Sequence, residues 1–164
     1  MNKSALTQAM KASISEVLEQ MFFMSIDFAD PANRDADTEP DATSIIAKLD
    51  FHGYPSGTFV LLIPASLARS VSADFLGATA HSLATQQVEA TVLEMVNMLA
   101  GNTLSRNDRQ ALFDLQIPEL IGFNDLRALN EAVSDQIVIQ ILTPENRLTF
   151  QLIMHQAENH HVNG

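Results

Sequence analysis

The chain has 164 residues, of which 46% are hydrophobic, and carries a formal net charge of −11 with no cysteine. This composition fits one globular domain and excludes disulfides, thiolate metal ligands and a cysteine nucleophile. The negative charge disfavours binding to nucleic acid or to an anionic membrane surface. No stretch approaches the roughly 18 consecutive apolar residues of a membrane span, and the N-terminus lacks the apolar core of a signal peptide. We therefore expect a soluble cytoplasmic protein.

The first part of the chain is predicted to form a helix and then a β-hairpin. Apolar side chains recur every three or four residues over 4–24, which predicts a helix with one buried stripe. The stripe consists of Leu6, Met10, Ile14, Val17 and Met21. Residues 27–41 are rich in aspartate and favour a polar loop; a calcium loop is the alternative, but the EF-hand glycine and terminal glutamate are missing. Strands are predicted over 43–51 and 58–63, joined by a turn over 52–57.

A connecting helix and a second, longer helix are expected next. Residues 64–76 predict the connecting helix, with Pro64 in its first turn. Residues 77–84 are expected to form a linker. Helical periodicity then extends over 85–105, where Arg106 and the polar residues after it interrupt the apolar pattern.

The last part of the chain predicts a second hairpin. The apolar segment 112–120 is expected to include a short strand that ends at Pro118, and 122–134 to be irregular or partly helical. Residues 136–143 and 147–155 are predicted as two strands joined by a Pro-Glu-Asn turn.

Together these elements predict an α+β sandwich, with helices packed on a mainly antiparallel sheet. Each half contains a helix followed by a hairpin, so we expect one domain over 1–156, with pseudo-repeat halves at about 4–64 and 85–156, and a polar C-terminal tail over 157–164. The sequences 12–19 and 90–97 support the repeat, because alanine aligns with alanine, glutamate with glutamate, and most apolar positions agree.

The long helix is expected to have one buried and one exposed side. The predicted buried positions are Val88, Val92, Met95, Val96, Leu99 and Thr103. The predicted exposed positions are Gln87, Ala90, Glu94, Asn97, Met98, Gly101 and Ser105. Glu94 and Asn97 are three residues apart and therefore neighbours on the exposed side. A carboxylate that can hold a cation beside an amide that can orient a water suits hydrolysis of a group on another molecule; two solvated surface residues are the alternative.

The small residues on this exposed side suggest close approach of a partner. Ala90 and Gly101 lie on either side of the Glu94/Asn97 pair. Glycine inside a helix lowers its stability by about 1 kcal/mol relative to alanine. The presence of Gly101 at this position therefore requires an explanation. Access for another backbone is one reason, and a helix end or a tight packing contact are the others.

Glu94-x-x-Asn97, followed by Met98-Leu99-Ala100-Gly101-Asn102, resembles the signature helix of the CheC/CheX chemotaxis phosphatases. The segment 115–118, Leu-Gln-Ile-Pro, resembles the apolar, proline-bearing segment that follows this helix in the family. The similarity spans roughly 4–156 and includes the duplicated helix and hairpin. CheC-type members have two Glu/Asn sites and CheX-type members have one, so this chain, with a single intact pair, resembles the CheX type. The resemblance also implies a homodimer.

The resemblance implies hydrolysis of the aspartyl phosphate on a CheY-type response regulator. Glu94 would hold the regulator's active-site lysine, and Asn97 would orient the attacking water. Gln87, Ala90, Met98 and Gly101 are the expected partner-binding residues around the pair. The chain itself is expected to bind no cofactor or metal, because the magnesium ion would lie in the regulator's acidic pocket.

Two features depart from the family pattern. Ala90 stands where the family often has an acidic or hydroxyl residue, and Pro118 is slightly closer to Asn97 than usual. In the first half of the chain Glu16 matches Glu94, but Glu19 replaces Asn97 and Phe23 replaces Gly101. A carboxylate at the water-positioning place would repel phosphoryl oxygens, so we predict that this half is catalytically silent and serves packing or dimerisation.

Two other interpretations compete with a phosphatase. One is a non-catalytic module of the same fold that docks a regulator or a flagellar component, and the other is an unrelated structural α+β domain. The histidines near the C-terminus are interpreted as part of a polar tail and not as a metal site. They are His155, His160 and His161.

Overall fold

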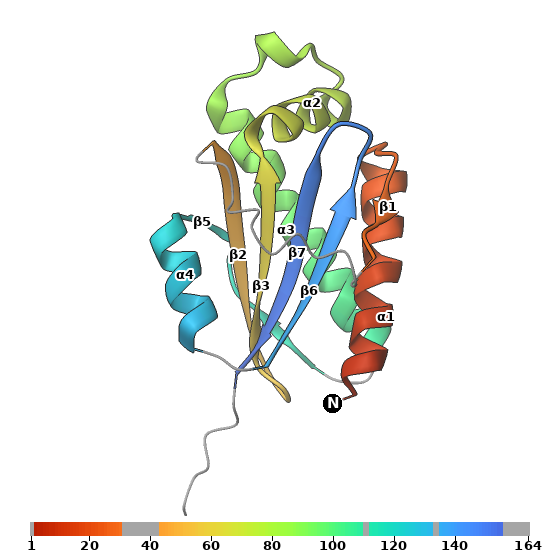
Figure 1. Cartoon of the computed structure of the whole chain (residues 1–164), viewed down its shortest axis with the longest axis vertical. Coiled ribbons are helices and arrows are strands. Elements are labelled where there is room, and N and C mark those ends of the chain that lie inside the picture. The colour runs from red at the N-terminus through yellow and green to blue at the C-terminus, as the bar shows by residue number, and fades with distance from the viewer. Residues whose placement is uncertain (1, 31–42, 110–111, 133–134, 156–164) are drawn as a thin grey trace, which may run out of the picture.

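The computed structural model describes residues 2–30, 43–109, 112–132 and 135–155 (Figure 1). Within these ranges seven strands form one antiparallel sheet, in the order β1-β6-β7-β3-β2-β4, and β5 also pairs with β2. The strands are β1 (Asp27–Phe28), β2 (Ser44–His52), β3 (Gly57–Pro64), β4 (Asp114–Leu115), β5 (Glu119–Ile121), β6 (Gln136–Leu142) and β7 (Arg147–Met154). The expected α+β architecture is confirmed.

Helices cover both faces of the sheet. The helical elements are α1 (Lys3–Ile14), the π-helix η1 (Ser15–Met21), α2 (Ala65–Leu76), the 3-10 turn η3 (Ala80–Ser82), α3 (Thr85–Asn107) and α4 (Phe123–Ala132). α1, α2 and α3 bury their apolar sides in the larger core, which also takes Leu49 and Phe51 of β2. The opposite face has a smaller core, in which Leu126 of α4 packs with Ile46 and Val60. The alternation along β2 explains the division, since successive side chains of a strand point to opposite faces.

The two hairpins meet at the centre of the sheet. β2 pairs with β3, β6 pairs with β7, and β3 and β7 join the hairpins. The short strands pair across the halves: β1 lies beside β6, while β4 and β5 lie beside β2. This reciprocal arrangement is what a duplicated helix-and-hairpin unit would produce, and the division of the domain into two halves remains a prediction.

The first helix is not one α-helix over 4–24, as the sequence predicted. Asn2 caps α1, and after Ile14 the chain continues as a π-helix, in which i→i+5 hydrogen bonds put more residues into each turn. The wider turns bring Phe22 into the core, where its ring stacks on Phe75 with centroids 4.7 Å apart. Met21, predicted to be in the buried stripe, is 45% exposed instead.

The polar region after this helix and the C-terminal tail are described only in part. Asp27 and Phe28 form β1, so the loop predicted over 27–41 begins later than expected. The rest of that loop from residue 31 on, and the tail 157–164, lie outside the described residues.

The segment between α3 and β6 differs most from the sequence prediction. Instead of one strand ending at Pro118, it forms β4 and β5, because Pro118 has no N–H with which to continue the ladder along β2. The connection over 122–134 contains α4, whose apolar residues Phe123, Leu126 and Leu129 all contact the smaller core. The predicted hairpin strands and α2 are confirmed to within one residue at every end.

Candidate functional site

The long helix α3 carries the candidate site, and its sequence explains both ends. The side chain of Gln87 accepts a hydrogen bond of 2.8 Å from the N–H of Ala84, which caps the first turn. At the other end α3 continues to Asn107, two residues beyond the prediction. All six predicted inner positions are buried. The inner side therefore fixes which side of α3 faces outward.

Glu94 and Asn97 lie on the outer side of α3, as predicted. Glu94 is exposed and Asn97 is half-buried. Within the part of the chain that the structure describes, neither side chain forms a hydrogen bond or an ion pair. The carboxylate and the carboxamide can therefore both interact with groups of another molecule.

The residues expected around the pair differ in their surroundings. Ala90 is exposed, and Gln87 is exposed although its side chain is used in the helix cap. Met98 is half-buried and packs against the larger core, so only part of it can face a partner. Gly101 is half-buried, and a Cβ atom built there would lie 3.8 Å from Cδ1 of Leu115. The surface beside Gly101 therefore belongs partly to the β4 segment.

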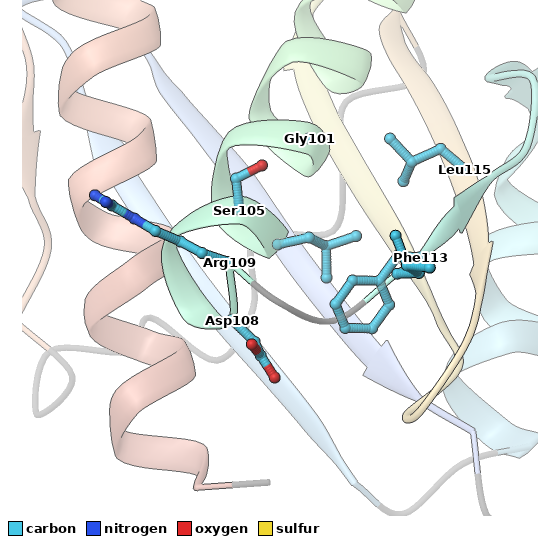
Figure 2. Close-up of a pocket in the computed structure, with 8 residues that line it drawn as sticks. Gly101, Ser105, Asp108, Arg109, Phe113 and Leu115 are labelled. Atoms are coloured by element: carbon cyan, nitrogen blue, oxygen red, sulfur yellow. The ribbon is translucent and has the colours of Figure 1, made fainter.

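A pocket of about 430 Å³ continues from Gly101 toward the end of α3. Figure 2 shows its two sides, with Gly101 and Ser105 on α3 facing Phe113 and Leu115 on the segment that contains β4. The sequence analysis placed Ser105 on the outer side but did not connect it to this segment. The register of the sheet explains this contact. Leu115 is paired with Phe51, so its side chain lies on the face of the sheet that α3 covers.

A polar junction attaches the same part of α3 to the first helical segment. Ser13 donates a hydrogen bond of 2.8 Å to Oδ1 of Asn102, which also accepts one of 2.6 Å from Nε of Arg106. Glu16 accepts hydrogen bonds from Nδ2 of Asn102 and from the guanidinium of Arg106, with which it forms an ion pair. The carboxylate that matches Glu94 in the first half is thus occupied by a side chain of the same protein.

Two other kinds of feature bear on function, a metal-binding cluster and a membrane-spanning helix. The described residues contain no group of three histidine, aspartate or glutamate side chains placed to bind a metal ion. His155 instead lies with Nε2 3.0 Å from Oγ1 of Thr58, and the other two C-terminal histidines are outside the described ranges. In the same ranges no helix combines the length and the apolar character needed to cross a bilayer.

The paired hairpins and the helices on both faces define a CheC-like α+β protein. The profile of the family described as chemotaxis phosphatase CheX matches residues 45–142, and the chain belongs to this family. The protein is accordingly a phosphatase, and so a hydrolase, of chemotaxis-type signalling.

Solved structures of low sequence identity share the fold. One is the CheX-CheY-BeF3-Mg+2 complex from Borrelia burgdorferi, with 15% identity, a TM-score of 0.71, and coverage of 92% of this chain and 98% of that chain. Chemotaxis protein CheX from Vibrio vulnificus has 15% identity and a TM-score of 0.68, with coverage of 92% of this chain and 96% of that chain. FliY from Thermotoga maritima has 13% identity and a TM-score of 0.61, with coverage of 94% of this chain and 91% of that chain. At these identities the likeness concerns the fold alone. Comparison with curated proteins gives no match.

Proposed function

We propose that this phosphatase hydrolyses the aspartyl phosphate of a CheY-type response regulator, with Glu94 and Asn97 as its catalytic residues. The observation that carries the proposal is that both side chains point outward from α3 and have no partner among the described residues. A structurally similar CheX from Borrelia burgdorferi is described in complex with CheY. The family membership and the free polar pair therefore support the same activity.

Asn97 is proposed to position the water that attacks phosphorus. Its amide oxygen can accept a hydrogen bond from the water and so fix the line of attack. The water forms a new P–O bond, the bond to the aspartyl oxygen breaks, and inorganic phosphate leaves while the carboxylate is restored. An acyl phosphate is already reactive, so positioning alone can account for much of the acceleration.

Glu94 is proposed to hold the regulator in register. Its exposed carboxylate can form an ion pair with the regulator's active-site lysine and so place Asn97 beside the phosphoryl group. The magnesium ion is assigned to the regulator's acidic pocket, and a Mg+2 ion is part of the Borrelia burgdorferi complex. The proposal includes a homodimer in the cytoplasm, and the family resemblance implies the dimer.

The test is to follow loss of phosphate from a phosphorylated CheY-type protein. We expect Asn97→Ala to lower kcat about 100-fold while regulator binding is largely retained, because a misplaced reacting group costs about that factor. We expect Glu94→Ala, in contrast, to weaken binding of the regulator in addition to lowering turnover. The matched controls are Asn124→Ala and Glu131→Ala, which change exposed residues of α4 on the other face of the sheet.

The competing interpretations give different results in this assay. A wild-type protein that binds the regulator without accelerating dephosphorylation would be a docking module. A protein that binds no phosphorylated regulator would favour a structural domain.

A further inference from the structure

Exposed apolar side chains are concentrated on the segment that crosses from α3 to α4. Of the eight large hydrophobic side chains that are exposed in the described chain, four lie within residues 112–120. Leu112 and Ile117 are 94% and 88% exposed, and Leu115 is 37% exposed. We call Leu112, Leu115 and Ile117 the apolar rim. Clustered exposed hydrophobics of this kind mark interaction surfaces.

The rim is held in place by the fold. Phe113, between two rim residues, packs edge-on against Phe51, with ring centroids 5.8 Å apart. Leu115 pairs with Phe51 in the sheet, and the N–H of Gln116 donates a hydrogen bond of 2.8 Å to the carbonyl of Asp50. The segment can therefore present Leu112 and Ile117 to solvent without being detached from the sheet.

The rim adjoins the proposed catalytic pair. Gly101 follows Asn97 by one helical turn, about 6 Å along the axis. Because Gly101 has no side chain, Leu115 reaches the surface of α3 at that point, 3.8 Å from where a Cβ would be. Ser105 and Leu112 also line the pocket beside Gly101. A partner that binds over Asn97 would therefore also contact the rim.

The outer side of α3 between Asn97 and the rim is uncharged. The outer positions of α3 from Asn97 to Ser105 are Asn97, Met98, Gly101 and Ser105, and none is charged. The whole chain has a net charge of −11, so most of its surface would repel an acidic protein. This strip is bounded by exposed acids, Glu94 and Asp108 on the side of α3 and Asp114 between the rim residues. The apolar rim, and not charge, therefore favours docking here.

We propose that the apolar rim docks the CheY-type regulator, contacting an apolar segment of the regulator beside its phosphoaspartate. This inference rests on the proposed function and deepens it, since the rim determines how tightly the substrate binds and Asn97 determines how fast it reacts. The regulator is favoured over a second copy of this chain because the rim continues directly from the catalytic strip, where the regulator must lie.

The test is the double variant Leu112→Ser/Ile117→Ser in the dephosphorylation assay. Both side chains are almost fully exposed, so we expect the variant to fold normally. We expect KM and the Kd for the regulator to rise about tenfold or more, since burial of one such side chain is worth about that factor, while kcat stays within about twofold. Asn97→Ala should show the opposite pattern. The matched control is Leu76→Ser, which changes a 46% exposed side chain at the end of α2.

Each outcome decides the proposal. If wild type accelerates dephosphorylation and the double variant keeps its KM, the rim proposal is wrong and the proposed function stands. If wild type binds the regulator without hydrolysis, the proposed function fails, and a raised Kd in the double variant still supports the rim. Absence of regulator binding overturns both. A change in oligomeric state of the double variant in sedimentation equilibrium would assign the rim to a second copy and overturn the proposal.

Discussion

The carboxylate of Glu16 forms an ion pair with the guanidinium of Arg106, near the end of α3. Glu16 is the position that matches Glu94 in the repeat, yet Glu94 has no such partner among the described residues. The two glutamates therefore have different roles. Glu16 is used to join the first helical segment to α3, whereas Glu94 is available for a cation that another protein brings.

The first helical segment is predicted to contribute nothing to the chemistry. Glu16 is occupied, and Glu19 lies in a π-helix, where a spacing of three residues does not place two side chains on one face as it does in α3. We expect Glu19→Ala to leave kcat and KM for the phosphorylated regulator within about twofold of wild type. Substantial activity in Asn97→Ala that disappears when Glu19→Ala is added would show that this segment is a second active site.

How much could be read from the sequence depended on whether periodicity determined burial. The inner side of α3 was predicted correctly, because its apolar residues recur at helical spacing over many turns. The π-helix was missed, because Met21 and Phe22 are both apolar and only packing against Phe75 selects Phe22. The rim was missed because Leu112 and Ile117 are aliphatic, and an aliphatic residue in a strand-like segment predicts burial unless the position of the sheet edge is known.

Gly101 offers a direct test of access to the outer side of α3. We expect Gly101→Ala to raise the free energy of unfolding by about 1 kcal/mol, because alanine favours the helix and its Cβ meets Leu115 only at ordinary contact distance, 3.8 Å. The KM of Gly101→Ala for the phosphorylated regulator should change little. Gly101→Leu should instead raise KM about tenfold or more, because the larger side chain stands where the regulator approaches. Urea denaturation and dephosphorylation kinetics measure the two effects. An unchanged KM in Gly101→Leu would place the regulator elsewhere.

A polar group on the opposite face of the sheet predicts how stability depends on pH. Burial favours a higher pKa for Asp50, but hydrogen bonds from Thr58 at 2.6 Å and from Lys48 at 3.0 Å outweigh it. The charges of Lys48 and His155 add to this effect, so the pKa of Asp50 is lowered. A lowered folded-state pKa stabilises the fold above the ordinary aspartate pKa of about 3.9, and this contribution is lost as pH falls through the lower folded-state value.

We therefore expect the stability of wild type to fall more steeply below about pH 4 than that of Asp50→Asn. Urea denaturation at a series of pH values measures the difference. The matched control is Asp74→Asn, which changes an exposed aspartate of α2. Parallel curves for wild type and Asp50→Asn would show that Asp50 is not responsible.

Gly57 is expected to respond to alanine in the opposite direction from Gly101. A Cβ atom at Gly57 would lie 2.6 Å from the carbonyl oxygen of Ile153 and 2.9 Å from Cζ of Phe51. β3 is paired on both sides, with β2 and β7, so the backbone cannot move away without disturbing the centre of the sheet. We expect Gly57→Ala to lower the free energy of unfolding by about 1–3 kcal/mol, as overpacking of a core usually does. The same substitution at Gly101 should instead stabilise the protein. One urea-denaturation series on both variants therefore separates the effect of local packing from that of helix propensity. Equal changes in the free energy of unfolding at both positions would contradict the packing described for β3.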